Sequence, residues 1–418
     1  MMPPAAAPAD GCEAPANLAE MIRTENTDLP YSERTAKSLS AAMSTFRFLM
    51  QERELEHPDA CDFMAGNPQE LAMPAYIETV QRALVPNSPS YYAYGPPWQP
   101  AVVAVAAALS KRLGIELDAE DVFLTRGASS GLAVLLHALV DPGDQVMMMS
   151  PPWFFYEAMV VAESAEPVKV PLAGDAFDLD VDAIEKAITP RTRAVIVNTP
   201  HNPSGRIYPE DQLKKLAGVL ERASERNHRR IYLLSDEAYA RILFDGREMI
   251  TPALYYPATF MLHTYSKTLL APSQRAGYMA MPPSMPAREQ LRTALMVASM
   301  GGGAVPDTAM QRAMPELEKM IIDIPAIQRR RDRMVGEMRR MGYAVESPEA
   351  TFYLFPRSPI PDATELCDWL AERRVYTLPG EAFERPGYFR LSLSATDAMV
   401  DRALPILAEA IRTFTQHS

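Results

Sequence analysis

Short apolar runs and helical patterns alternate along the chain from residue 77 to residue 281. The runs are apolar at consecutive positions, as in strands that are buried on both faces of a parallel sheet. The stretches between them repeat apolar residues at helical spacing. This alternation predicts an α/β fold in which helices cover both faces of a mostly parallel sheet. Strands are expected at 121–125, 145–149, 193–198, 231–235, 260–265 and 277–281, and helices at 77–84, 102–113, 130–140 and 209–226.

The pattern changes after Pro306, where a long, charged helical stretch is expected at residues 310–341. The basic run from Arg329 to Arg333 is interpreted as a solvated face of that helix. Short strands and amphipathic helices then alternate, which predicts a smaller α+β domain. These strands are expected at 351–355 and 388–394, and these helices at 363–373 and 397–413.

The chain has 418 residues, more than a typical single domain, so one large and one smaller domain are expected. Residues 74–306 are assigned to the large domain and residues 307–418 to the small C-terminal domain. Residues 19–73 are expected to contribute to the small domain. Residues 1–18 are rich in Ala and Pro and are expected to form a disordered tail, because they cannot bury enough apolar surface to offset their ordering.

Charge and composition exclude several classes of protein. A net charge of −12 opposes binding to nucleic acid or to an anionic membrane. The N-terminus lacks the basic and apolar regions of a secretory signal, and no apolar run is long enough to span a membrane. Cys12, Cys61 and Cys367 are scattered, so neither a disulfide framework nor a metal site is expected. These features predict a soluble, cytoplasmic protein.

Polar residues gather directly after five of the expected strands. In open α/β sheets, ligands bind beyond the carboxyl ends of the strands, so these clusters are expected to meet in one site. One cluster ends in Lys267, and a lysine directly after a buried strand is costly unless its amine has a partner or a function. The clusters are residues 125–129, 151–153, 198–205, 235–239 and 265–267.

Three of these clusters, followed by Arg275, carry the motifs of a known family. Asn-Pro-Ser-Gly at 202–205, Asp-Glu-Ala-Tyr at 236–239 and Ser-Lys at 266–267 have an order and spacing similar to those of the aspartate aminotransferase family. The chain thus resembles the class I/II, fold-type I enzymes that depend on pyridoxal 5′-phosphate. The resemblance implies a large cofactor-binding domain with a mostly parallel, seven-stranded sheet between helices, and a smaller α+β domain.

The resemblance also assigns the catalytic residues. Lys267 is expected to hold the cofactor as a Schiff base and to move the substrate proton. Asp236 is expected to keep the pyridine nitrogen protonated, so that the ring can accept carbanion charge. Asn202 and Tyr239 are expected to hydrogen-bond to the phenolic oxygen of the cofactor. The alternatives are a helix N-cap for Asp236, an Asn-Pro turn for Asn202 and core packing for Tyr239.

The phosphate of the cofactor needs hydrogen-bond donors at the start of a helix. The resemblance implies that the backbone amides of Gly127, Ala128 and Ser129 supply them. Ser266 and Arg275 are expected to complete this phosphate site, with Arg275 as a bidentate partner. A plain strand-to-helix turn and a surface ion pair of Arg275 are the alternatives.

Further positions match family residues that contact the ring or the substrate. Trp153 matches the aromatic residue that stacks on the cofactor. Arg390 matches the arginine that binds the substrate α-carboxylate. Gly66 is expected to let the backbone approach that carboxylate, and Asn202 to contact the substrate as well.

Because family members place residues of one subunit in the site of the other, the resemblance also implies a homodimer. Tyr94 resembles the tyrosine that reaches the phosphate of the partner subunit, although Tyr91 and Tyr92 compete for this role.

The expected reaction moves the amino group of an L-amino acid to a 2-oxo acid through the Lys267 Schiff base and pyridoxamine phosphate. Departures from the family pattern at Gln69, Glu70 and Gln274 leave open a lyase, a synthase or an amino-acid oxidase on the same scaffold.

The substrate side chain is not assigned by the sequence. In this family, dicarboxylate substrates need a second arginine, for which Arg126, Arg241 and Arg292 are candidates.

Overall fold

The computed structural model describes residues 31–49 and 53–415 and contains a seven-stranded sheet. Its strands lie in the order β2-β8-β7-β6-β5-β3-β4, and every neighbouring pair is parallel except the two pairs made by β8. The α/β fold is therefore confirmed, with all six expected strands present. The seven strands are β2 (Val122–Thr125), β3 (Gln145–Ser150), β4 (Glu166–Pro171), β5 (Thr192–Asn198), β6 (Tyr232–Asp236), β7 (Thr259–Thr264) and β8 (Gly277–Ala280).

Both faces of this sheet are covered, because successive side chains of a strand point to opposite sides. In β7, Leu262 packs with helix α5 on one face, whereas Met261 packs with α4 and α11 on the other. Burial on both faces explains why the strands are apolar at consecutive positions. The helices around the sheet are α4 (Gln99–Leu113), α5 (Ala128–Leu139), α6 (Tyr156–Ala162), α7 (Val181–Ala187), α8 (Glu210–Arg226), α9 (Tyr265–Thr268), α10 (Arg288–Gly301) and α11 (Thr308–Leu317), with 3₁₀ helices η1 (Ala119–Asp121) and η2 (Pro252–Leu254).

One strand, β4, is absent from the sequence prediction. It lies at the edge of the sheet and contains Pro167 and Pro171. Proline usually argues against a strand, but an edge strand tolerates it because one row of its N–H groups has no ladder partner.

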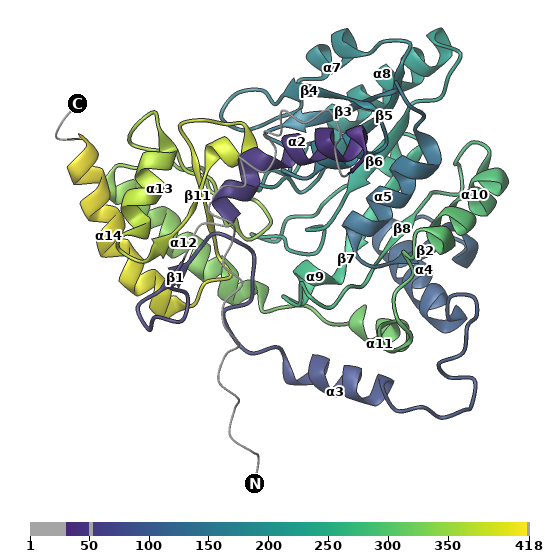
Figure 1. Cartoon of the computed structure of the whole chain (residues 1–418), viewed down its shortest axis with the longest axis horizontal. Coiled ribbons are helices and arrows are strands. Elements are labelled where there is room, and N and C mark those ends of the chain that lie inside the picture. Colours follow the sequence, from purple (N-terminus) through teal and green to yellow (C-terminus); the bar gives the residue numbers. More distant parts are fainter. Residues whose placement is uncertain (1–30, 50–52, 416–418) are drawn as a thin grey trace.

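A second group of strands and helices lies beside the large sheet (Figure 1). Three of its strands form an antiparallel sheet in the order β11-β12-β9, next to a separate core that includes residues of α12, α13 and α14. Strand β1 (Cys61–Asp62) pairs in parallel with β10 (Val375–Tyr376), which joins the N-terminal segment to this group. The remaining elements are β9 (Tyr353–Leu354), β11 (Leu378–Pro379), β12 (Phe389–Ser392), η3 (Gly380–Phe383), α12 (Ile324–Met341), α13 (Ala363–Ala371) and α14 (Asp397–Thr415).

The single long helix expected at 310–341 is wrong, because two helices, α11 and α12, occupy this stretch. Asp323 caps the start of α12 through the backbone N–H of Ala326, and Pro325 follows in its first turn. The interpretation of Arg329 to Arg333 as a solvated face is also wrong in part. Arg330 and Arg331 are buried, and they pair with Asp397 and Asp245.

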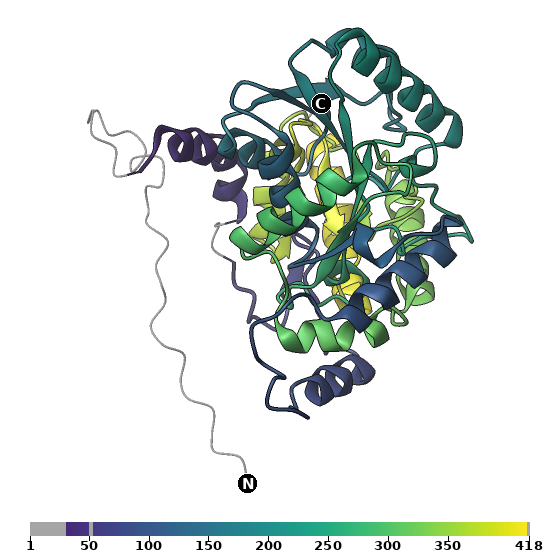
Figure 2. The same ribbon diagram turned by 90° about the vertical axis from the view of Figure 1, so that its right-hand side faces the viewer.

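Helix α3 (Pro74–Ala83) lies at the lower edge of the molecule in both views, and α2 (Glu33–Leu49) lies at its left edge in Figure 2 (Figures 1 and 2). Helix α2 packs on α6, and α3 packs on α11. The expected disordered tail at residues 1–18 lies outside the described residues, as does the beginning of the segment 19–73. Within the described part of the chain, no helix is long and apolar enough to cross a membrane.

Candidate active site

A cavity opens at the carboxyl edge of the large sheet, where the expected site residues converge. Its lining includes residues at the ends of β5, β6 and β7 and at the start of α5, as expected for an open α/β sheet. The antiparallel strand β8 begins at the same edge, which places Arg275 there. The cavity is lined by Ala128, Ser129, Trp153, Asn198, Asn202, Asp236, Ala238, Tyr239, Thr264, Ser266, Lys267, Pro272 and Arg275.

Lys267 and Asp236 both line this cavity. Among the described residues, the Nζ of Lys267 has no hydrogen-bond acceptor, and it lies 5.9 Å from the centre of the Phe352 ring. The carboxylate of Asp236 accepts hydrogen bonds from the hydroxyl of Tyr156 and, at 3.2 Å, from the N–H of Ala238. Burial raises the pKa of Asp236, while these two donors and the charge of Lys267 act in the opposite direction.

An anion site lies at the start of α5. Gly127 precedes the helix with φ +85°, and a Cβ atom there would lie 2.7 Å from Nη2 of Arg275. The guanidinium of Arg275 donates to the hydroxyls of Ser266 (2.8 Å) and Ser129 (3.1 Å). No carboxylate in the described part of the chain pairs with Arg275, and burial lowers its pKa. Hydroxyls, an unpaired guanidinium and a helix start fit the phosphate of the expected cofactor.

Arg390 lies at the other side of the site, fully buried on β12. Its Nη1 donates to Oδ1 of Asn202 (3.0 Å) and its Nη2 to the carbonyl of Met64 (2.7 Å). Its Nε is buried without a hydrogen-bond partner in the described structure, and burial lowers its pKa. A donor left free on a buried guanidinium fits a carboxylate ligand.

Gly66 also allows a close contact that the sequence did not indicate. A Cβ atom at this position would lie 2.5 Å from the ring of Phe352 and 2.6 Å from the hydroxyl of Tyr353. The glycine therefore lets these two aromatic side chains approach the N-terminal segment.

Tyr156 and Tyr353 are residues of the site that the sequence analysis missed. The hydroxyl of Tyr353 lies 3.5 Å from that of Tyr239, and the guanidinium of Arg390 stacks 4.0 Å above its ring. Burial opposes ionisation of Tyr353, but the charges of Lys267 and Arg390 and hydrogen bonding to Tyr239 hold its pKa below the ordinary value. Neither tyrosine stands in a motif, so no local signal marked them.

Tyr94 is an expected site residue that the structure does not bring to the cavity, since its side chain is fully exposed on the segment between α3 and α4. The two competing tyrosines have partners at the end of α3 and directly after it. Tyr91 donates to the carbonyl of Ala83 (2.7 Å), and Tyr92 donates to that of Leu84.

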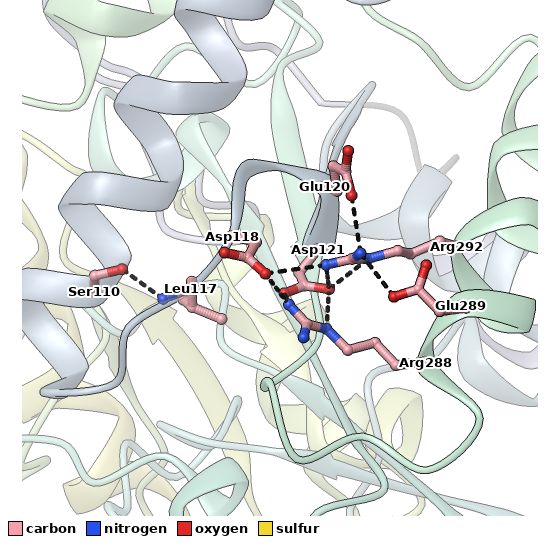
Figure 3. Close-up of polar contacts among 8 residues, drawn as sticks. All are labelled: Ser110, Leu117, Asp118, Glu120, Asp121, Arg288, Glu289 and Arg292. Atoms are coloured by element: carbon pink, nitrogen blue, oxygen red, sulfur yellow. Dashed lines mark hydrogen bonds and ion pairs between the residues drawn. The ribbon is translucent and has the colours of Figure 1, made fainter.

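The three candidate arginines for a second carboxylate have partners elsewhere. Arg292 pairs with Asp121, which is completely buried, in the cluster of charges at the start of β2 (Figure 3). Arg241 contacts the carboxylate of Glu318 (3.7 Å) and the carbonyl of Met320 (2.9 Å). Arg126 is exposed and donates to the carbonyl of Val305 (3.1 Å).

Comparison with known proteins agrees with this geometry. The sequence profile of the family described as aminotransferase class I and II matches residues 59–407. The chain is 29% identical over 365 residues to the aspartate/prephenate aminotransferase of Thermus thermophilus, which covers 84% of this chain and 91% of that protein.

Solved structures show the same similarity. An aminotransferase from Eubacterium rectale superposes with a TM-score of 0.81 at 25% identity, over 97% of this chain and all of that one. The N-succinyldiaminopimelate aminotransferase of Mycobacterium tuberculosis gives a TM-score of 0.75 at 26% identity, over 89% and 96% of the two chains. The chain therefore belongs to the class I and II aminotransferase family, and it is an enzyme that transfers amino groups with pyridoxal phosphate as its cofactor.

Proposed function

We propose that Lys267 is the catalytic base and the covalent anchor of the cofactor, and that Asp236 is the partner of its pyridine nitrogen. The observation that supports this most directly is the free amine of Lys267 in one cavity with a buried carboxylate. Once bound, pyridoxal phosphate supplies an electron sink for the charge that develops at the substrate Cα. The Nζ of Lys267 would take the proton from that Cα and hold it until it is returned to complete the transfer.

The surrounding side chains orient the reactants. Arg275, with Ser266, Ser129 and the N–H groups of Gly127 and Ala128, would hold the phosphate at the start of α5. The partly exposed ring of Trp153 lines the cavity and would stack on the cofactor.

Asn202 and Tyr239 would hydrogen-bond to the phenolic oxygen of the cofactor. Arg390, which donates to Asn202, would bind the substrate α-carboxylate next to Gly66. The contact between Arg390 and Asn202 connects the carboxylate site to the cofactor site, so that both groups are fixed relative to Lys267.

We also propose a homodimer in which Tyr94 contacts the cofactor phosphate of the partner subunit. Tyr94 is fully exposed, and several large apolar side chains near it in sequence or on α10 are exposed as well. A dimer interface over these side chains would remove their apolar surface from water. These side chains are Leu84, Val85, Met296, Val297 and Met300. Sedimentation of an active monomer at assay concentration would contradict this proposal.

The division of the chain is a further part of the proposal: 74–306 as the large domain, and 19–73 with 307–418 as the small one. The separate sheets and apolar cores support it, and limited proteolysis that fails to cut near these boundaries would count against it.

We also propose a cytoplasmic location, in keeping with the two buried, free cysteines, Cys61 and Cys367. Cell fractionation tests this location.

A half-reaction tests the chemistry. Adding single L-amino acids to the purified holoenzyme should convert the absorbance of bound pyridoxal phosphate to that of pyridoxamine phosphate, with release of the matching 2-oxo acid. The Lys267→Ala variant should show no conversion. Formation of pyruvate with ammonia, or uptake of oxygen, in place of this conversion would assign the scaffold to a lyase or an oxidase instead.

A further inference from the structure

The lysine of the cavity is carried by a very short helix. Helix α9 contains four residues, about one turn, and such a turn is not stable by itself. At its beginning, the N–H of Tyr265 donates to the carbonyl of Ala276 (3.0 Å), directly before β8. At its end, the carbonyl of Thr268 accepts from the N–H of Ile322 (3.0 Å). The position of Lys267 therefore depends on the segments that contact α9.

Tyr265 lies on the side of α9 that faces away from the cavity. Residues two positions apart on a helix lie about 200° apart, so Tyr265 packs in the apolar core with α4 and α11 while Lys267 lines the cavity. The hydroxyl of Tyr265 donates to Oε1 of Glu318 (2.5 Å), in the segment that joins α11 to α12. Burial and the charge of Glu318 raise the pKa of Tyr265, so this hydroxyl keeps its proton and acts as a donor.

Glu318 also contacts the turn that carries Tyr239. Arg241 lies two residues after Tyr239, and its Nη1 makes no hydrogen bond in the described structure but faces Oε2 of Glu318 at 3.7 Å. Its Nη2 donates to the carbonyl of Met320 (2.9 Å). The side chain of Glu318 is 6% exposed and that of Arg241 is 15% exposed, so solvent ions screen this pair little. One carboxylate thus contacts two turns that both line the cofactor cavity.

We propose that Glu318 is a positioning residue, which holds the amine of Lys267 and the hydroxyl of Tyr239 in a fixed arrangement at the cavity. It acts through Tyr265 and Arg241 and does not itself line the cavity. This inference rests on the proposed function, because it takes Lys267 as the base and the anchor of the cofactor. A catalytic amine displaced by about 1 Å can lose about 100-fold in rate, since bond formation and proton transfer need close alignment.

The rate at which the cofactor becomes attached tests the position of the amine directly. When pyridoxal phosphate is added to the cofactor-free protein, the amine of Lys267 condenses with the aldehyde with loss of water, and the change in absorbance gives the rate. Pyridoxamine phosphate carries an amine in place of the aldehyde and cannot form this bond, so its dissociation constant measures the pocket alone. Tyr265→Phe should slow the condensation about tenfold and leave that dissociation constant within about twofold of wild type.

Steady-state kinetics, with the L-amino acid that converts the cofactor fastest, separate positioning from binding. Glu318→Ala should lower kcat about 100-fold and change KM by less than about threefold, because the phosphate site and Arg390 are untouched. Glu318→Gln retains an oxygen that accepts from Tyr265, so its kcat should stay within about threefold of wild type. Adding Tyr265→Phe to Glu318→Ala should lower kcat no further, since the hydroxyl has already lost its partner.

Tyr256→Phe is the matched control for Tyr265→Phe. Tyr256 is also buried, and its hydroxyl donates to the carbonyl of Ile231 (2.5 Å), but it does not line the cavity. The control loses a buried hydrogen bond of the same kind. It should change neither the rate of condensation with pyridoxal phosphate nor kcat.

An unchanged rate of condensation in Tyr265→Phe overturns the inference, even if Glu318→Ala does not fold. A loss of affinity for pyridoxamine phosphate that equals the loss of rate also overturns it, because the whole pocket would then have changed. Borohydride reduction of the wild-type holoenzyme and peptide mapping identify the lysine that carries the cofactor. Cofactor on a lysine other than Lys267 refutes the proposed function together with the inference, whereas cofactor on Lys267 with unaffected variants refutes the inference alone.

Discussion

At the start of β2, Asp121 lies between the guanidinium groups of Arg288 and Arg292 (Figure 3). Arg275, beyond the end of the same strand, faces no carboxylate of the described chain. Asp121 is completely buried, and Arg288 and Arg292 bind it from the first turns of α10. This cluster therefore holds α10 against the sheet, whereas Arg275 at the opposite end of the strand is unpaired and can bind an anionic ligand.

The two groups of charges differ in the direction of their pKa shifts. Hydrogen bonding to Asp121 raises the pKa of Arg288, and the same carboxylate outweighs the effect of burial on Arg292. Burial lowers the pKa of Arg275 and Arg390, because no described carboxylate faces either of them. Removing one partner of a buried ion pair destabilises the fold, and cations that are left unpaired at a buried edge indicate where an anion binds.

Among variants that distinguish the unpaired charges from the neutralised ones, Lys267→Ala should have the largest effect. Removing the only amine of the cavity lining should lower kcat by about 10⁴-fold, because no other base there can move the Cα proton. The free energy of unfolding of the cofactor-free protein should change by about 1 kcal/mol or less, since the amine makes no hydrogen bond in the described structure and acts on Asp236 through its charge. Steady-state kinetics and urea unfolding measure the two quantities.

The matched control is Lys169→Ala. Lys169 is also partly exposed, but it pairs with Glu157 (2.7 Å) and Glu384 (2.6 Å). The Lys169→Ala variant should lose little free energy of unfolding and no activity. A Lys267→Ala enzyme that keeps a tenth of the wild-type kcat is incompatible with the assigned role.

Asp121→Ala should have the opposite profile. Two guanidinium groups would lose the buried carboxylate that they share, and the free energy of unfolding should fall by about 4 kcal/mol. The kcat per folded molecule should stay within about twofold of wild type. Asp118→Ala removes an exposed carboxylate of the same cluster and should cost much less stability. A kcat that falls in parallel with stability for Asp121→Ala would mean that the two ends of β2 are not independent.

The cofactor half of the site could be predicted from sequence because its residues stand in contiguous motifs at strand ends. Segments 202–205, 236–239 and 266–267 each follow or end a buried strand, and parallel strands bring their carboxyl ends to one edge in any order. The fold class followed from the same alternation of strands and helices. Edge strand β4 escaped prediction because its prolines hide the strand pattern.

Arg390 and Gly66 were assigned only through the family resemblance, and the contacts around the site could not be predicted, because they join segments that are distant in sequence. Tyr156 reaches Asp236 across 80 residues, and Tyr353 reaches Tyr239 across 114. Tyr353 stands in a strand of only two residues, which has no periodicity to detect. The burial of Arg330 and Arg331 likewise depends on Asp397 and Asp245, which approach them only in the folded chain.

A buried carboxyl next to the site should produce a pH-dependent effect of intermediate size. Burial raises the pKa of Glu237 to about 7, although it accepts hydrogen bonds from Ser235 and Thr251. Since the folded state then binds this proton more tightly than the unfolded state, the stabilising contribution is full below about pH 4.5 and is lost as the pH rises through 7.

Glu237→Gln removes this titration and keeps a polar side chain of the same shape. Relative to wild type, the variant should gain about 3 kcal/mol in the free energy of unfolding between pH 4.5 and pH 8. The variant is compared with wild type because buried His201 also makes stability depend on pH in both proteins. Burial lowers the pKa of His201 to about 4, so its effect on stability has the opposite direction. Its contribution is present above pH 6.5 and is lost as the pH falls towards 4. Urea unfolding at several pH values gives the free energy of unfolding of both proteins. A difference between the two proteins that is the same at every pH would contradict this expectation.

The smallest effect is expected for Tyr156→Phe, which removes only the hydroxyl that donates to Asp236. Because this hydrogen bond lowers the pKa of Asp236 against the effect of burial, its loss should raise that pKa further. The carboxylate would then pair less well with a cationic ring nitrogen, so kcat should fall about tenfold and the acid limb of the kcat/KM profile should move to higher pH.

The control for Tyr156→Phe is Tyr76→Phe, because Tyr76 on α3 is also buried but its hydroxyl has no partner in the described structure. It should change neither kcat nor the pH profile. A Tyr156→Phe enzyme with an unshifted acid limb and a lower kcat would show that Tyr156 supports packing and does not set the charge of Asp236. In that case Asp236 would hold its charge through Ala238 and Lys267 alone, and the contrast between paired and unpaired charges would apply to the arginines only.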